Sequence, residues 1–169
     1  MSKELLKKRV SDLSKRVANI LKETFKDRLV SVCLFGSGAK GELRGGSDLD
    51  FLVVIKNGQK SYHKRVKEII PVLDKIRETE EYRCLEESKM NLEPCFLILT
   101  EGEIERHPSI LIDISQEGII QYDRGGFLLE TLREIRESLV KLGSVKKSTP
   151  QGHYWVLKPD LKPGEVIEI

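Results

Sequence analysis

The sequence has 169 residues, of which 39% are hydrophobic, and it carries a formal net charge of +2. This length and composition are typical of a single globular domain with its own core, and no apolar run approaches the roughly 18 residues of a membrane span. The charge is too small to indicate a nucleic-acid surface, so binding to nucleic acid is left open. The start lacks the apolar stretch of a signal peptide, which predicts a cytoplasmic protein without membrane contacts.

The first part of the chain predicts one helix and two strands. An apolar stripe at helical spacing predicts an amphipathic helix over residues 3–27. Two runs rich in β-branched and aromatic residues, 29–35 and 50–55, predict buried strands. They are joined by a glycine-rich loop, and residues 56–59 predict a turn after the second strand.

The next segment predicts a helix followed by irregular chain. Ser61 is placed to cap the helix, and Pro71 inside it predicts a kink or a division. Residues 79–92 are polar and predict irregular structure. The predicted apolar face of the helix carries Val66, Ile69, Ile70, Leu73 and Ile76.

A third buried strand is predicted at residues 94–99, since a proline near a strand's start removes little hydrogen bonding. Thr100 and Glu103 form a capping box, which predicts a short helix. Residues 110–114 are apolar and their type is left open, whereas residues 118–122 predict a short strand.

The C-terminal part predicts a second long amphipathic helix over residues 127–142, which ends at Gly143. Residues 144–152 are polar and are expected to be mobile. The tail from residue 153 predicts two short strands around a Pro-Gly turn. Tyr154 and Trp155 are expected to anchor it on the domain, with stacking on a base as the alternative.

The remaining composition gives two weaker indications. Cys33, Cys84 and Cys95 form no CxxC pair, so free buried thiols are expected in preference to a zinc site. Charged residues make up 33% of the chain, and this favours a thermophilic source, where ion-pair networks are common.

The loop at residues 36–41, GSGAKG, matches the pattern GxGxxG. A dinucleotide-binding fold would need a helix to open at the last glycine, whereas a glycine pair and a new strand follow within ten residues. A protein-kinase loop also joins two strands, but no HRD or DFG triplet follows. The Walker A pattern fails because Glu42 stands where lysine is required.

The loop is nevertheless suited to phosphate, because glycines let backbone N–H groups approach phosphate oxygens closely. Ser37 adds a hydroxyl, and Lys40 and Arg44 add positive charge. An ordinary glycine-rich turn between strands is the alternative. The predicted nucleotide-binding residues are Gly36, Ser37, Lys40, Arg44 and Ser47.

Asp48 and Asp50 are two residues apart at the entry to a predicted strand. Side chains two apart on a strand point to the same face, so both carboxylates can converge on one cation. Hard oxygen ligands suit Mg²⁺ or Mn²⁺. A turn at Ser47-Asp48 with a solvated Asp50 is the alternative, but a phosphate loop followed by a carboxylate pair combines the parts that phosphoryl transfer needs.

The stretch GSGAKGELRGGSDLDFLVV resembles the nucleotidyltransferase (DNA polymerase β-like) superfamily, whose signature is Gly-Ser on a helical turn, then Asp-x-Asp on the next strand. Gly36, Ser37, Asp48 and Asp50 match that signature position by position. The SDLDFLV and AKGE segments are similar to the small prokaryotic, often archaeal, minimal nucleotidyltransferases, although Lys40 stands where those proteins often have arginine.

The resemblance implies an α/β (α+β) fold, a mixed sheet with helices packed mainly on one side. It also implies an NTP substrate and two Mg²⁺ ions, held by Asp48, Asp50 and a third carboxylate from a neighbouring strand. Glu93 is the preferred third acid, because the residue before a proline favours extended geometry. Asp113 is the other candidate, since a carboxylate in an apolar run needs a partner.

The implied activity is transfer of a nucleoside monophosphate to an acceptor hydroxyl by a domain over residues 1–143, with residues 144–169 packed on it as an extension. Small members of the superfamily often occur beside a helical partner protein, sometimes as the antitoxin of a toxin pair, so a protein acceptor or toxin is an expected partner. The alternative is a non-catalytic module that binds a nucleotide or a partner. The acceptor, the base and a homo-oligomeric state are left open.

Overall fold

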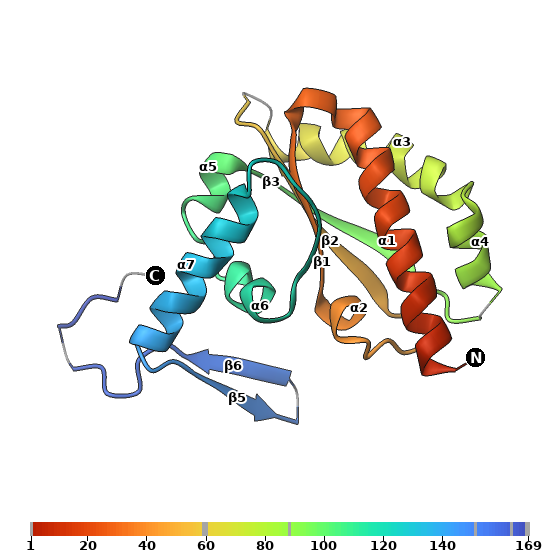
Figure 1. Cartoon of the computed structure of the whole chain (residues 1–169). Coiled ribbons are helices and arrows are strands. Elements are labelled where there is room, and N and C mark those ends of the chain that lie inside the picture. Colours follow the sequence, from red (N-terminus) through yellow and green to blue (C-terminus); the bar gives the residue numbers. More distant parts are fainter. Residues whose placement is uncertain (1, 59–60, 88, 151, 163, 168–169) are drawn as a thin grey trace.

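A computed structural model describes the chain except for residues 1, 59–60, 88, 151, 163 and 168–169 (Figure 1). Its centre is a mixed sheet in the order β3-β2-β1-β4, in which β1 runs antiparallel to β2 and β4, and β3 runs parallel to β2. The predicted α/β class with a mixed sheet is confirmed. The strands are β1 (Leu29–Phe35), β2 (Asp48–Ile55), β3 (Glu93–Thr100) and β4 (Ile119–Asp123).

Helices cover both faces of this sheet, where the sequence predicted helices mainly on one side (Figure 1). On one face lie α1 (Lys3–Phe25), α3 (Tyr62–Arg77) and α4 (Glu80–Glu86). On the other lie α5 (Glu101–Ile104), α6 (Ile110–Glu117) and α7 (Phe127–Lys141). None of the described helices is long and apolar enough to span a membrane.

The two central strands explain why both faces are covered. Their apolar runs are continuous, which is the pattern of strands buried on both sides. In β2, Phe51 and Val53 belong to the core beneath α1, whereas Leu52 and Val54 belong to the core beneath α7. The predicted strand at residues 29–35 is confirmed, and the second strand begins two residues earlier than predicted, at Asp48.

Helix α3 differs from its prediction in two respects. It runs unbroken through Pro71, which lies on its exposed side, and Ser61 makes no side-chain cap. Its buried residues are Arg65, Ile69, Val72 and Ile76, while Val66 and Ile70 are exposed. The buried stripe includes Arg65 because this guanidinium forms an ion pair with Glu103 at 2.7 Å.

The polar segment 79–92 was expected to be irregular, but it contains α4. The Thr79 side chain accepts a hydrogen bond from the backbone N–H of Tyr82 at 3.3 Å, which caps the helix. Tyr82 and Leu85 are its only buried residues, so the helical stripe is too short to be recognised as a periodic pattern.

Several shorter elements agree with the sequence. The capping box of Thr100 and Glu103 is present, and α7 ends shortly before Gly143, which has a φ of 65°. Residues 110–114, whose type the sequence left undecided, are helical. Strand β4 confirms the prediction of a short strand. The predicted turn at residues 56–59 extends beyond the described residues, because residue 59 is outside them.

The C-terminal segment forms a hairpin, of which the sequence predicted the second strand but not the first. Strands β5 (Val145–Thr149) and β6 (Gly152–Val156) pair antiparallel, so the first of them lies where a mobile linker was expected. No strand occurs in the described part of the tail after Val156, and Pro163 of the predicted turn lies outside the described residues. Trp155 packs on the core beneath α7 and so anchors the hairpin, as predicted, whereas Tyr154 is half exposed.

The cysteines are free, as expected, but only Cys33 is buried. Cys84 is partly exposed and Cys95 is exposed, so the expectation of buried thiols is wrong for these two. Cys95 lies in β3, next to the aspartate pair of β2, because the registers of the two parallel strands pair it with Asp50.

Candidate active site

Gly36 brings the glycine loop into contact with the carboxylate pair. The chain leaves β1 at Phe35 and turns directly into α2 (Gly36–Lys40), with Gly36 at a φ of +66°. A Cβ atom at this position would lie 2.5 Å from Oδ2 of Asp50, which is closer than real Cβ contacts allow. Glycine is therefore required both by the backbone conformation and by the approach of the Asp50 carboxylate.

Asp48 and Asp50 open β2 and point to the same face of the sheet. Asp50 is half buried, and burial followed by the charge of Asp48 raises its pKa above the usual value of 3.8. A divalent cation between the two carboxylates would relieve this repulsion. The donor set consists of hard oxygens, so Asp48 and Asp50 fit Mg²⁺ or Mn²⁺.

Glu93 does not complete this pair. Its Cα lies opposite that of Asp48 in the register of β2 and β3, as the sequence predicted for a neighbouring strand. Its carboxylate, however, accepts hydrogen bonds from the Tyr82 hydroxyl at 3.0 Å and from the Arg77 guanidinium at 3.2 Å. Within the described ranges, no group of three His, Cys, Asp or Glu side chains is arranged to hold a metal ion.

Asp113, the second candidate for the third acid, lies in α6 and not on a strand. Its Oδ1 accepts hydrogen bonds from Trp155 Nε1 at 3.1 Å and contacts His153 Nε2 at 2.9 Å and Lys146 Nζ at 3.1 Å. These partners all come from the hairpin, so Asp113 holds the hairpin against α6.

The residue beside the aspartates that the sequence analysis missed is Cys95. Although Cys95 is exposed, partial desolvation by its neighbours, then the charges of Asp50 and Asp48, raise the pKa of its thiol above the usual 9.0. The alternation of β3 was a usable signal, because Cys95 follows Glu93 by two residues and therefore shares its face.

A surface pocket of about 900 Å³ lies beside the loop and collects three of the predicted nucleotide-binding residues, Ser37, Arg44 and Ser47. The N-terminal turn of α1 forms part of its wall, with Lys3 among the lining residues. The Ser47 hydroxyl accepts a hydrogen bond from the Arg44 backbone N–H at 2.9 Å. A turn before Asp48, considered above as the alternative to a metal site, is thus present, and its residues Arg44 and Ser47 line the pocket.

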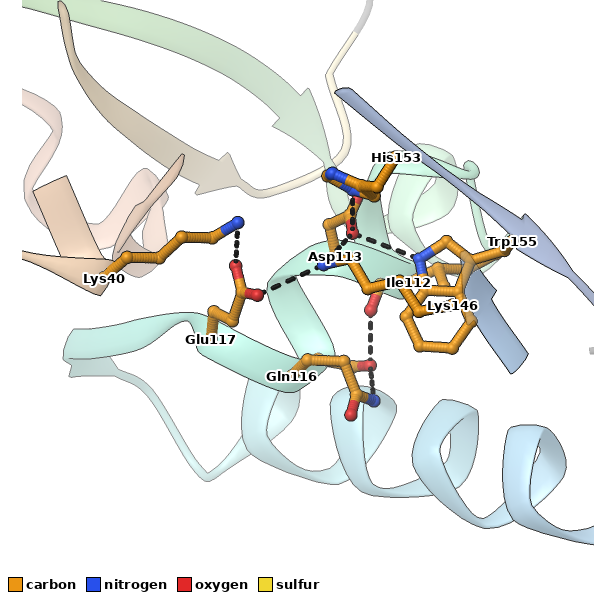
Figure 2. A network of polar contacts seen from close by, with 9 residues as sticks. Lys40, Ile112, Asp113, Gln116, Glu117, Lys146, His153 and Trp155 are labelled. Carbon is orange, nitrogen blue, oxygen red and sulfur yellow. Dashed lines mark hydrogen bonds and ion pairs between the residues drawn. The ribbon is translucent and has the colours of Figure 1, made fainter. Parts of the chain in front are cut away.

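Lys40 does not line this pocket but forms an ion pair with Glu117, at 2.7 Å between Nζ and Oε2. Figure 2 shows this pair as one end of a polar network that continues to Lys146 and Asp113. Glu117 was not predicted as part of the site. Its available signal was the spacing of four residues from Asp113, which places both acids on one face of a helix.

We expect the Asp113→Asn variant to be less stable than the wild type at neutral pH, and this deficit to shrink in acid. Burial opposes ionisation of Asp113, but hydrogen bonds from Trp155, His153 and Lys146 together hold its pKa below the usual 3.8. A carboxyl with a lowered pKa stabilises the fold above its unfolded pKa and loses this contribution as the pH falls through its folded pKa.

Urea unfolding of both proteins at neutral pH and at about pH 2.5 measures this deficit. Asp12→Asn, a change at an exposed position of α1, serves as the control. A deficit of equal size at both pH values would contradict the role of the ionised Asp113.

Comparison with known families gives one match that covers most of the chain. Residues 14–120 match the family described as "Nucleotidyltransferase domain". The spectinomycin 9-adenylyltransferase of Enterococcus faecalis is 34% identical over 73 residues, which are 42% of this chain and 29% of the relative. The protein of the same name from Staphylococcus aureus (strain Mu50 / ATCC 700699) is 32% identical over 89 residues, which are 52% and 34% of the two chains. This chain spans about a third of the length of these relatives.

Two solved structures show lower similarity. A spectinomycin adenyltransferase from Enterococcus faecialis, solved with ATP and spectinomycin, is 16% identical with a TM-score of 0.48, over 78% of this chain and 66% of that chain. A toxin-antitoxin crystal structure with AMP-PNP is 13% identical with a TM-score of 0.47, over 77% of this chain and 92% of that chain.

Proposed function

The chain belongs to the nucleotidyltransferase domain family, and from this premise we propose that it is a metal-dependent enzyme that transfers the nucleoside monophosphate of an NTP to an acceptor hydroxyl. The observation that carries the proposal is the contact between Gly36 and the Asp50 carboxylate. It brings a loop suited to phosphate against the carboxylates suited to a cation, and phosphoryl transfer requires the two together.

The proposed roles follow from the positions of the side chains. Ser37 and Arg44, which line the pocket beside α2, would contact the phosphates of the NTP, and so would Ser47. Asp48 and Asp50 would hold the divalent cations. When bound, these cations neutralise the charge of the triphosphate and of the leaving pyrophosphate.

The names of the relatives guide the choice of substrates. Both are spectinomycin 9-adenylyltransferases, which supports ATP as the first nucleotide to test and a small-molecule hydroxyl as one class of acceptor. A hydroxyl on a partner protein, such as the helical partner implied by the resemblance, is the second class.

The test is incubation of the purified protein with Mg²⁺ and each common NTP labelled at the α-phosphate, together with spectinomycin or a candidate partner protein. We expect the label to move to an acceptor, with one pyrophosphate released per transfer, and EDTA to stop the reaction. Transfer of a label from the γ-phosphate would contradict the proposal, and so would a protein that binds none of these NTPs.

The second candidate function is a non-catalytic module that binds a nucleotide without transfer. It is favoured by one observation, the engagement of the Glu93 carboxylate by Tyr82 and Arg77 away from the aspartate pair. In the enzyme, Glu93 would have to leave these partners and turn toward Asp48, which lies opposite it in the register. In the binding module it would keep them.

If the protein is an enzyme with Glu93 as its third acid, we expect Glu93→Gln to keep its affinity for Mg²⁺–NTP and to lose at least about a hundredfold in the rate of transfer. The amide oxygen of glutamine can still accept the hydrogen bond from Tyr82, so the fold should be little changed. Single-turnover transfer and equilibrium NTP binding measure the two effects separately.

Tyr82→Phe is the matched control, because it removes one hydrogen bond to Glu93 and leaves the carboxylate held by Arg77 alone. It should retain transfer. If Glu93→Gln transfers at the wild-type rate, Glu93 is not the third acid, and Asp113→Asn tests the other candidate.

A further inference from the structure

Lys40 belongs to the glycine loop that approaches the carboxylates of Asp48 and Asp50. It is the last residue of α2 and follows Gly36 by four positions. Gly36 opens the same short helix, and its backbone lies against the Asp50 carboxylate. Lys40 is therefore about one helical turn from the residue that approaches Asp50, so its long side chain can reach the phosphates of a nucleotide held near that carboxylate.

Glu117 holds the Lys40 ammonium. Its Oε2 lies 2.7 Å from Lys40 Nζ, while its Oε1 lies 3.1 Å from Lys146 Nζ. Figure 2 shows the Glu117 carboxylate between these two ammonium groups. The side chains of Lys40 and Glu117 are only 24% and 29% exposed, so solvent screens this pair less than a surface pair.

The C-terminal hairpin holds Lys146, the second partner of Glu117, in place. Lys146 of β5 contacts Asp113 Oδ1 at 3.1 Å and lies over the ring of Trp155, 5.6 Å from its centroid. Asp113 is also bound by Trp155 Nε1 at 3.1 Å. The contacts thus form a continuous chain from the hairpin through Lys146 and Glu117 to Lys40.

We propose that Glu117 is a positioning residue that orients Lys40 for contact with the phosphates of the NTP. Lys146 of the hairpin in turn holds Glu117 in place. The inference rests on the proposed function, in which the loop binds a triphosphate. A lysine that is already held in place loses less side-chain rotamer freedom on binding than a mobile one. When Lys40 turns to a phosphate oxygen, Glu117 keeps Lys146 as a partner, so its carboxylate is not left uncompensated.

The test compares Glu117→Gln, Lys40→Met and the double variant in calorimetric binding of ATP with Mg²⁺. Glu117→Gln should weaken binding about fivefold, the scale of a partly exposed ion pair. Lys40→Met should weaken it at least as much. Because Glu117 acts through Lys40, the double variant should bind no more weakly than Lys40→Met alone.

A second readout needs no nucleotide. The rate at which Lys40 is acetylated by acetic anhydride, followed by mass spectrometry, should rise in Glu117→Gln because the ammonium is released from its partner. Glu165→Gln is the matched control, since it breaks the Lys158–Glu165 pair of 2.8 Å elsewhere on the chain. It should change neither the acetylation of Lys40 nor the affinity for ATP.

Unchanged or tighter ATP binding by Glu117→Gln would overturn the inference, the latter because Glu117 would then compete with phosphate for Lys40. Additive losses in the double variant would also overturn it. In both cases the wild type still binds ATP, so the proposed function stands. A wild type that binds none of the common NTPs overturns the proposed function and this role with it, whatever the acetylation rate of Lys40.

Discussion

Replacing both Asp48 and Asp50 by asparagine is expected to lower nucleotide transfer by at least about a thousandfold, or about 4 kcal/mol of barrier. The amides keep the shape of the side chains but remove the charge that would hold the cations. Mg²⁺ should raise the thermal midpoint of the wild type and leave that of the variant unchanged, because only a protein that binds the ion is stabilised by it. Transfer rates and thermal unfolding with and without Mg²⁺ measure both effects.

The same variant should be at least as stable as the wild type when no metal is present. Burial and the charge of Asp48 raise the pKa of Asp50, so the ionised pair destabilises the metal-free fold. Neutral side chains remove this repulsion. A loss of activity that is accompanied by a lower thermal midpoint in EDTA would indicate damage to the fold, and transfer within about tenfold of the wild type would contradict the assigned roles.

The elements that the sequence predicted best are those with a long periodic or apolar pattern. The continuous runs of β1 and β2 and the stripe of α1 leave little choice of structure, since each buries many residues. Helix α4 was missed because it buries only Tyr82 and Leu85. Strand β5 was missed because its residues, VKKST, are mostly exposed, and the stability of the hairpin depends on contacts of β6 with α6 that no local pattern reveals.

In the candidate site too, contacts between residues close in the sequence could be predicted, and contacts between distant segments could not. Gly36 directly follows β1, and Asp50 lies near the start of β2. Because these consecutive strands pair with Phe35 opposite Asp50, the contact follows from local order along the chain. The direction of the Glu93 carboxylate could not be predicted, because it depends on Tyr82 in the unpredicted helix α4 and on Arg77. The pairing of Lys40 with Glu117 could not be predicted either, because the two residues are far apart along the chain and meet only in the folded structure.

Gly36→Val is expected to abolish detectable binding of Mg²⁺–NTP, a loss of more than about a hundredfold. The new Cβ would lie 2.5 Å from Oδ2 of Asp50, so either the loop or the carboxylate must move. A displaced loop no longer presents its backbone N–H groups to phosphate, and a displaced Asp50 no longer pairs with Asp48 around a cation. Calorimetric titration with ATP and Mg²⁺ measures the loss.

The strain of the backbone must be separated from the displacement of Asp50, and Gly125 provides the matched control. Its φ is also +66°, but no described atom lies within 4 Å of the position that a Cβ would occupy. Gly125 lies just before α7, next to Arg124, whose backbone N–H donates a hydrogen bond to Val30 near the start of β1. Gly36 follows the other end of the same strand. Valine costs about 1–3 kcal/mol of strain at either position, so both variants should lose similar stability in urea unfolding. Only Gly36→Val should lose the nucleotide. If it binds ATP as well as Gly125→Val does, the close approach of Gly36 to Asp50 has no part in binding, and the loop is a turn that only connects two strands.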